Sequence, residues 1–307
     1  MDNPAKIIMI GSGCIDEYYE LDYVPALGEK TCCKPVGKIV GGMIGNAAAV
    51  AASYGMDVYL MDRVNRSEDT QTVLEDFRQN GVKLDLVEFD KTLPDVKCLI
   101  FLKDGERIIY VIPTRKSQLV LTEQQLRTIG EAQYVYTTLA ELRCFREPEA
   151  SVAAMRDGGA KLVLDVEYIE QSQLELEWYL LQEADILFVN EEGDRQLREK
   201  VGEDYQERLK QDTVIVLTKG REGSVVYTGN TCRHVVPAYS VEPVDTTGAG
   251  DTFNASFVYG LSRGWDMLRS AQFASAAAAR AISHLGARSG AVTVDKVLDF
   301  MNQQRGD

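Results

Sequence analysis

The chain has 307 residues, of which 45% are hydrophobic and 26% are charged, and its formal net charge is −14. This composition supports a sizeable buried core in one large α/β domain or two smaller ones. The acidic balance argues against nucleic-acid binding, which needs a basic face, although a nucleotide can still be held by helix N-termini and a metal ion. No apolar run approaches the length of a membrane span, so we expect no membrane partner.

Six cysteines and two histidines are present, and no two cysteines have C-x-x-C spacing. This pattern predicts neither a zinc site nor a disulfide framework. We therefore expect free thiols in a reducing cytoplasm.

The first predicted element is a buried strand at 6–10 (KIIMI), which is followed by GSGCID at 11–16. The G-S-G sequence is not a dinucleotide-binding motif, because Asp16 stands at the third glycine position and no helical pattern follows. A strand end that faces a ligand fits better, since open α/β sheets bind ligands beyond the carboxyl ends of their strands. Asp16 then either faces the ligand, to which its carboxylate offers only hydrogen-bond acceptors, or is a capping residue.

Two segments predict a small accessory sheet. Residues 17–40 are interrupted by prolines and glycines between short alternating pieces, and residues 95–112 read as a hairpin around the turn Asp104-Gly105. We expect 14–40 and 95–112 to form a β lid on a single α/β domain that spans 1–307. An exposed face of such a lid is suited to association with a second chain.

A glycine pair, Gly41-Gly42, precedes an alanine-rich helical pattern. These glycines permit close approach of the backbone to a ligand, and Asn46 lies one turn into the helix, where its amide needs partners. The alternative is a helix of small residues used only for packing.

From residue 57 onwards, apolar strands and amphipathic helices alternate. This order predicts right-handed crossovers and a mostly parallel, doubly wound sheet with helices on both faces. The predicted strands are 57–61, 133–136, 161–164, 186–189 and 213–217, and the predicted helices are 69–80, 123–129, 147–156, 173–182, 205–210 and 273–282.

The stretch 244–255 (VDTTGAGDTFNA) contains two carboxylates around small residues, at the start of an apolar helical pattern. Glycines at the mouth of a helix let backbone N–H groups converge on an anion, with help from the helix dipole. Asp251 could there accept a proton from a hydroxyl while the N–H groups hold the charge of a transferring phosphoryl group. The alternative is an ordinary glycine-rich turn with Asp251 as the N-cap.

The sequence DTTGAGDTF at 245–253 resembles the C-terminal signature of the ribokinase-like (PfkB) family of carbohydrate and nucleoside kinases. GGMIGNAA at 41–48 is similar to the family's N-terminal signature G-G-x-x-x-N-x-A, and TKGREG at 218–223 to its nucleotide loop T-x-G-x-x-G. The resemblance implies that Asp251 is the catalytic base and that the N–H groups of Gly248, Ala249 and Gly250 form the anion hole. It also implies ATP and Mg²⁺ as cofactors.

The resemblance assigns further roles. Sugar hydroxyls would be bound by Asp16, Gly41, Gly42 and Asn46. ATP would lie along Asn190, Thr218, Gly220, Gly223 and, near the adenine, Ser275, and a monovalent cation such as K⁺ would be bound at Asp245 and Thr247. Glu141, after the strand QYVYT, either faces the substrate or is a solvated loop acid. The β lid would make a homodimer contact, as in many members of the family.

Two departures from the family pattern stand out. In the motif N-x-x-E, which positions Mg²⁺ through water, the Glu is replaced by Gly193, so Glu191 or Glu192 is the expected substitute unless other groups handle the metal. In D-x-N-x-R, Glu167 and Ile169 replace the Asn and Arg. This loop therefore supplies no arginine clamp for a substrate carboxylate.

We expect ATP-dependent phosphorylation of a primary hydroxyl of a small sugar. A nucleoside kinase is one alternative, in which Tyr18, Tyr19 and Tyr110 line a base pocket unless they are packing residues of the lid. A regulatory binding protein without turnover is the other. Gly193 favours that alternative, and the intact Asp251 opposes it.

Overall fold

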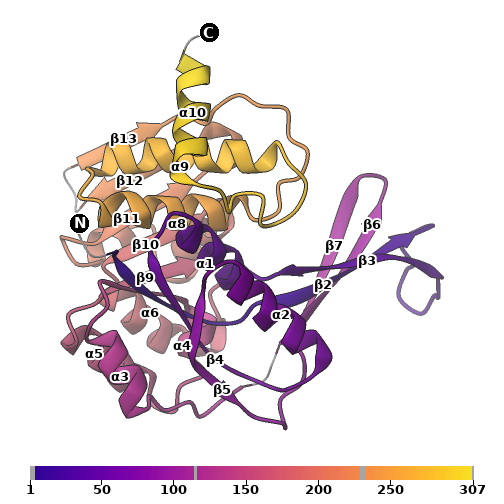
Figure 1. Cartoon of the computed structure of the whole chain (residues 1–307), viewed down its shortest axis with the longest axis horizontal. Helices are drawn as coiled ribbons and strands as arrows, with labels where there is room; N and C mark the ends of the chain where they lie inside the picture. The colour runs from indigo at the N-terminus through magenta and orange to yellow at the C-terminus, as the bar shows by residue number, and fades with distance from the viewer. Residues whose placement is uncertain (1–3, 114–115, 229–231, 306–307) are drawn as a thin grey trace.

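The computed structural model describes residues 4–113, 116–228 and 232–305. Its centre is a nine-stranded sheet with the order β13-β12-β11-β10-β9-β8-β1-β4-β5 (Figure 1). All neighbouring pairs from β5 to β11 in this order are parallel. The pairs β11–β12 and β12–β13 are antiparallel. The bounds are β1 Lys6–Ile10, β4 Asp57–Val64, β5 Lys83–Phe89, β8 Tyr134–Thr138, β9 Lys161–Val166, β10 Ile186–Asn190, β11 Val214–Thr218, β12 Ser224–Thr228 and β13 Cys232–Val236.

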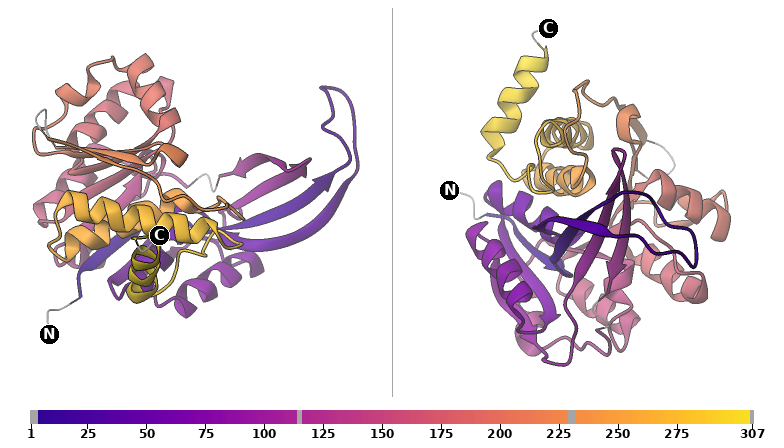
Figure 2. Two further views of the ribbon diagram at one scale, coloured as in Figure 1. Left: turned by 90° about the horizontal axis from the view of Figure 1, so that it is seen from above. Right: turned by 90° about the vertical axis from the view of Figure 1, so that its right-hand side faces the viewer.

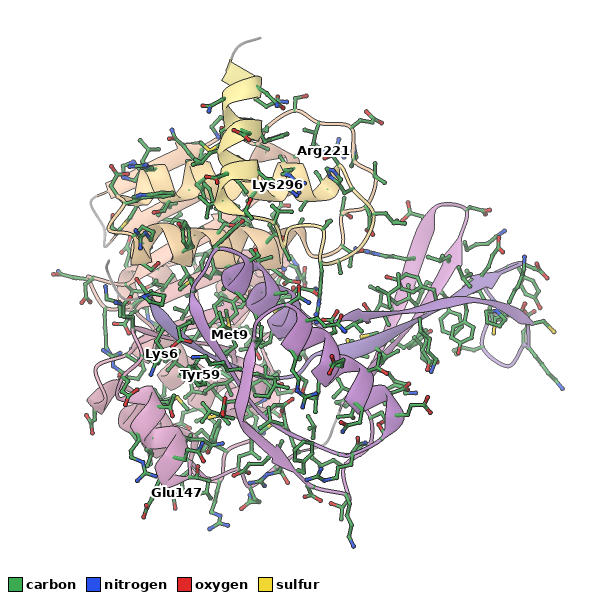
Figure 3. All side chains as sticks on the ribbon, viewed as in Figure 1. Lys6, Met9, Tyr59, Glu147, Arg221 and Lys296 are labelled. Atoms are coloured by element: carbon green, nitrogen blue, oxygen red, sulfur yellow. The ribbon has the colours of Figure 1, made fainter. Side chains whose placement is uncertain are left out.

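Helices cover both faces of this sheet (Figure 2). One layer contains α1 Met43–Ser53, α2 Glu68–Gln79, α8 Ala249–Ser262, α9 Met267–Ile282 and α10 Val294–Arg305. The other contains α3 Glu123–Ile129, α4 Leu139–Leu142, α5 Pro148–Asp157, α6 Leu174–Glu183 and α7 Glu191–Lys200. The central strands are apolar almost throughout because both of their faces are buried, and Met9 of β1 (Figure 3) has no exposed surface.

Four strands form a separate small sheet with the order β3-β2-β6-β7. Its strands are β2 Cys14–Leu21, β3 Cys33–Gly41, β6 Lys97–Lys103 and β7 Glu106–Ile112. The small sheet extends away from the main body (Figure 2). The turn between β6 and β7 has positive φ at Asp104 (51°) and Gly105 (83°), which is the geometry that an Asp-Gly pair favours in a tight hairpin.

The predicted fold class, a mostly parallel doubly wound sheet with a small β-sheet beside it, is confirmed. Some elements differ from their predictions. The predicted helix at 205–210 is a short 3₁₀ helix, η2, Tyr205–Arg208. The helix predicted at 273–282 begins at Met267, because the side chain of Asp266 accepts the N–H of Arg269 at 2.7 Å and caps it. Two more 3₁₀ turns, η1 Gln171–Gln173 and η3 Gly220–Glu222, complete the described elements. No helix in the described ranges is both long and apolar enough to cross a membrane.

Candidate active site

The N-termini of α1 and α8 meet beyond the carboxyl ends of the parallel strands. Asn46 in the first turn of α1 donates a hydrogen bond from Nδ2 to Asp251 Oδ2 at 2.8 Å. This contact joins the two sequence motifs across 205 residues of chain. Asn46 is buried and Asp251 is half-buried, so this carboxylate is largely shielded from solvent.

The start of α8 leaves its first N–H groups available to a ligand. Among the described residues no side chain caps this helix, although the Ala249 N–H lies 3.3 Å from the carbonyl oxygen of Thr246. Gly248 has φ of 76°, and a Cβ there would lie 2.0 Å from the carbonyl oxygen of Ala287. Only glycine fits, so Gly248 serves the close packing of this loop as well as the helix start.

Asp251 belongs to a group of carboxylates whose charges act on one another. Burial raises the pKa of Asp251 well above the ordinary value, and the charges of Asp165, Glu167 and Asp16 raise it further, while the hydrogen bond from Asn46 lowers it. A carboxylate whose proton affinity is raised in this way is a stronger general base than one in water.

Asp165 supports this region from the end of β9. Its Oδ2 accepts hydrogen bonds from the Tyr136 hydroxyl at 2.8 Å and from Asn254 Nδ2 at 2.8 Å. Burial and the charge of Glu167 raise the pKa of Asp165 to about 7. This buried network fixes the α8 side chain of Asn254, one turn beyond Asp251, against the central sheet.

The other predicted substrate residues lie beside this pair. A Cβ on Gly41 would lie 2.2 Å from Asp16 Oδ2, so the glycine lets the Asp16 carboxylate rest against the backbone. Gly42 has φ of 95° and is the N-cap residue of α1. Burial raises the pKa of Asp16. Asn46 therefore contacts Asp251 directly, Asp16 is near enough for its charge to act on Asp251, and Gly41 lies against Asp16.

Glu141 lies in a buried ion cluster that the sequence did not indicate. Its Oε2 is 2.7 Å from Lys116 Nζ, which is also 2.5 Å from Asp62 Oδ1 and 3.2 Å from Ser12 Oγ. Burial lowers the pKa of Lys116, but the charges of Asp62 and Glu141 outweigh this effect and raise it above the ordinary value. Glu141 is thus not a solvated loop acid, and Lys116 neutralises much of its charge.

A large cavity of about 910 Å³ reaches the start of α8, where Ala249 and Gly250 line it. Its lining includes the predicted nucleotide and anion-hole residues Thr218, Gly220, Gly223, Ala249, Gly250 and Ser275, and also Glu191, which was predicted to help position Mg²⁺. Gly223 has φ of 99°, and a Cβ there would lie 2.1 Å from the Val236 carbonyl oxygen. Glycine is needed at this position because β13 passes directly behind the loop.

The first turn of α7 shows how the altered N-x-x-E motif is accommodated. Asn190 caps the helix, because its Oδ1 accepts the Gly193 N–H at 2.7 Å. A Cβ on Gly193 would lie 2.4 Å from the Val166 carbonyl oxygen, so no larger residue fits without movement. Glu192 is engaged by Arg195 along the exposed side of α7, at 2.5 Å, whereas Glu191 lines the cavity.

Asp245 orders the loop before α8. Its Oδ1 accepts the Thr247 N–H at 2.9 Å, and its Oδ2 accepts the Gly286 N–H at 3.0 Å. Burial raises the pKa of Asp245, but these backbone hydrogen bonds outweigh it and hold the pKa below the ordinary value. The Thr247 hydroxyl accepts a hydrogen bond from Arg107 Nη1 of β7 at 2.6 Å, which connects the small sheet to this loop.

Sequence reasoning missed Arg107, Lys116, Tyr136 and Asn254. Arg107 and Lys116 lie in segments without a recognisable motif, so only the chain path brings them to the site. Asn254 was within the quoted stretch 244–255, and its spacing of three residues from Asp251 places it on a neighbouring helix face.

Comparison with known proteins agrees with this geometry. Residues 5–294 match the family model described as pfkB family carbohydrate kinase. The chain is 26% identical over 304 residues to a ribokinase of Bacillus subtilis, which covers 97% of this chain and 99% of that protein. It is 28% identical over 315 residues to an ATP-dependent ribose-1-phosphate kinase of Halopiger xanaduensis, covering 98% and 99%.

The fold is also that of solved structures. Ribokinase of Arabidopsis thaliana, in a complex with ribose and ATP, superimposes with a TM-score of 0.81 at 22% identity, over 97% of this chain and 98% of that one. The family match covers nearly the whole chain and includes every motif that meets at Asp251. The chain is therefore a member of the pfkB family of carbohydrate kinases.

Proposed function

We propose that this kinase transfers the γ-phosphoryl group of ATP to a primary hydroxyl of a small sugar, with Asp251 as the general base. The observation that carries the proposal is the Asn46–Asp251 hydrogen bond at the uncapped start of α8. This bond holds a carboxylate of raised pKa, and the residues just before it, Ala249 and Gly250, line the cavity along Thr218–Gly223.

Each part of the site has a separate task in this proposal. Asp16, Gly41, Gly42 and Asn46 orient the acceptor so that its hydroxyl faces Asp251. Asp251 removes the hydroxyl proton as the oxygen attacks in line, and the N–H groups of Gly248, Ala249 and Gly250 hold the developing charge. The nucleotide lies along Thr218, Gly220, Gly223 and Ser275.

The residues present are suitable for Mg²⁺ bound through water. Glu191 lies at the cavity wall, and Glu167 is close enough for its charge to act on Asp165 and Asp251. Carboxylate oxygens are the ligands that Mg²⁺ prefers. We propose that Glu191 and Glu167 take the place of the missing glutamate at 193, and Mg²⁺ would neutralise charge on the phosphates. Glu192 has a smaller part here than expected because Arg195 holds it.

A monovalent-cation site at Asp245 and Thr247 is a further part of the proposal. Asp245 already orders the loops at 247 and 286, so a K⁺ ion near it would stiffen the anion hole. We expect K⁺, but not Li⁺, to raise the rate of the wild-type enzyme. We expect Asp245→Asn to lose this activation. Equal rates in both salts would contradict this part and leave the role of Asp251 intact.

The central test is Asp251→Asn. Removing a general base should lower kcat at least about a hundredfold while the fold and ATP binding are retained. A matched control is Asp295→Asn, an exposed acid in the first turn of α10, which should keep normal turnover. Coupled ADP-release kinetics and ATP binding by calorimetry give the two readouts, and near-normal turnover by Asp251→Asn would contradict the assignment.

A nucleoside acceptor remains the second candidate. Tyr18 lies two residues after Asp16 on the same face of β2, and burial, with a smaller effect from the charge of Asp16, raises the pKa of Tyr18 to about 12. Tyr19 stacks on Phe101 on the opposite face and does not favour a base pocket. ADP release over a panel of sugars and nucleosides distinguishes the two acceptor classes. ATP binding without turnover on any acceptor would favour a regulatory protein.

We also propose that the small sheet closes over the acceptor as a lid and forms a homodimer contact. Its strands expose large apolar side chains, including Ile39 (44%), Ile109 (45%) and Val111 (66%). These residues share the sheet face of Asp16 and Cys98, because the register pairs Ile39 with Asp16 and Val111 with Cys98, and Ile109 lies two residues before Val111 on β7. Closure of the lid would exclude water and suppress ATP hydrolysis.

A further inference from the structure

Three potential metal ligands meet at the base of the small sheet. Cys14 Sγ lies 3.2 Å from Asp16 Oδ1 and 3.9 Å from Cys98 Sγ. All three ligand atoms lie within 4.8 Å of one another. Cys14 and Asp16 are buried, and Cys98 is half-buried. This cluster is set apart from the cavity along Thr218–Gly223, and the proposed reaction uses only its carboxylate.

The strand register creates the cluster. Residues 14 and 16 of β2 point to one face because side chains alternate along a strand. Cys98 of the neighbouring parallel strand β6 is paired with Asp16 and therefore points to the same face. The sequence spacing of the cysteines could not reveal this, because 84 residues separate the two thiols.

The same register disfavours a disulfide. Cys14 lies diagonally from Cys98, two residues along the neighbouring strand, and strand spacing and rise place their Cα atoms about 8 Å apart. A disulfide needs Cα atoms closer than about 7 Å. A metal ion can bridge the longer span. Two thiolates bound tetrahedrally to Zn²⁺ at about 2.3 Å lie about 3.8 Å apart, close to the separation observed here.

The chemistry of the donors selects the ion. Two thiolates and one carboxylate suit a thiophilic cation such as Zn²⁺, and they discriminate against the Mg²⁺ that accompanies ATP. The charges of Arg107 and Arg288 act on Asp16 and oppose a cation there, which moderates the affinity.

We propose that Cys14, Asp16 and Cys98 form a binding site for a thiophilic divalent cation of the Zn²⁺ class, and that an ion bound there blocks the acceptor. Three protein ligands leave the fourth position of a tetrahedral ion open to water or a ligand. An ion bound to Asp16 removes a carboxylate oxygen from the acceptor. The proposed inhibition of acceptor binding rests on the proposed function of Asp16, whereas the proposed metal binding does not.

Metal binding is tested directly on the full-length protein, reduced and freed of metal. Titration with Co²⁺ should produce a thiolate charge-transfer band, and calorimetry should show Zn²⁺ binding with one ion per chain. Cys98→Ser and Cys14→Ser should each weaken binding at least about tenfold. The control is the double variant Cys32→Ser/Cys33→Ser, which removes two exposed thiols of the small sheet and should bind as the wild type does.

Two results would overturn the metal site: binding that persists in both Cys98→Ser and Cys14→Ser, or binding that is lost in the Cys32/Cys33 control. The kinetic arm measures Zn²⁺ inhibition of each variant relative to its own uninhibited rate. We expect inhibition that is competitive with the sugar, not with ATP, and that is relieved in Cys98→Ser. If Zn²⁺ binds through the thiols but does not change the KM for the sugar, then the proposed block and the proposed role of Asp16 are both overturned. The rate without Zn²⁺ tests the kinase function separately.

Discussion

Asp251 carries a cost in stability that its position in the site explains. Its carboxylate is partly removed from water and surrounded by Asp165, Glu167 and Asp16, and these surroundings raise its pKa. The folded state therefore holds the Asp251 proton more tightly than the unfolded state does. The contribution of Asp251 to the free energy of unfolding is therefore fully present below the pKa that Asp251 has in the unfolded chain, and it is lost as the pH rises through its pKa in the folded protein.

Asp251→Asn should accordingly be more stable than the wild type above the folded pKa of Asp251. The difference should be on the order of 1.4 kcal/mol for each unit by which folding raises that pKa, and it should shrink towards pH 4. Urea denaturation of both proteins at several pH values measures it. A variant that is equally stable, or less stable, at pH 8 would show that the wild-type carboxylate carries no such cost.

Two neighbours of Asp251 should shift its titration in opposite directions. Asn46→Ala removes the hydrogen bond that favours the carboxylate, so the pKa of Asp251 should rise and the acid limb of kcat/KM should move to higher pH. Glu167→Gln removes a negative charge, so the same limb should move to lower pH.

The pH profile of kcat/KM checks both shifts. Ser53→Ala on α1 and Glu170→Gln in the loop of Glu167 are the controls, and both should keep the wild-type profile. If the acid limb moved in the same direction in Asn46→Ala and in Glu167→Gln, the proposed electrostatic control of the Asp251 pKa would be contradicted.

At the scale of elements, the start of α7 packs so closely against β9 that glycine is required where the family motif has glutamate. The backbone at Gly193 lies against the Val166 carbonyl at the end of β9, and Glu167 follows immediately. Glu167 therefore provides a carboxylate close to the position where residue 193 has none, which is why we propose it as a metal ligand.

Introducing the motif glutamate by Gly193→Glu should therefore not improve ATP binding or turnover. Its Cβ would overlap the Val166 carbonyl oxygen, and relieving that overlap should lower the free energy of unfolding by about 1–3 kcal/mol. The control is Glu192→Ala on the exposed side of α7, which should cost less than about 1 kcal/mol. Unchanged stability of Gly193→Glu together with a lower KM for ATP would contradict this reading.

At the scale of the whole molecule, the small sheet is the part for which we propose a second copy of the chain as a partner. Its outer strands expose apolar side chains on the face that adjoins the site, while Arg107 ties the sheet to Thr247. Apolar surface of this kind favours association.

Ile109→Lys should convert a dimer into a monomer, because a lysine in the centre of an apolar interface loses its hydration. Light scattering after size-exclusion chromatography measures the mass. Val120→Lys, at an exposed position outside the small sheet, is the control and should leave the mass unchanged. A wild-type protein that is monomeric at high concentration would contradict the proposed contact.

The sequence alone determined the fold class and most of the motif positions. Apolar runs such as 6–10 and 213–217 can only be buried on both faces, and that requirement leads to a parallel sheet covered by helices. Local signals such as Asp104-Gly105 and Gly41-Gly42 act through backbone conformation, so they could be recognised without the rest of the chain. The charged helix α7 was missed because its apolar face is too narrow to stand out.

Only the tertiary structure decided which side chains act on one another. Lys116 neutralises Glu141, Arg107 reaches Thr247, and Cys98 joins Cys14 and Asp16, in each case across a long stretch of chain. Such pairs depend on strand order and register, which place distant residues side by side. Periodicity within a short window reports burial, but it carries no information about the identity of the neighbour, and the chemistry of this site depends on that identity.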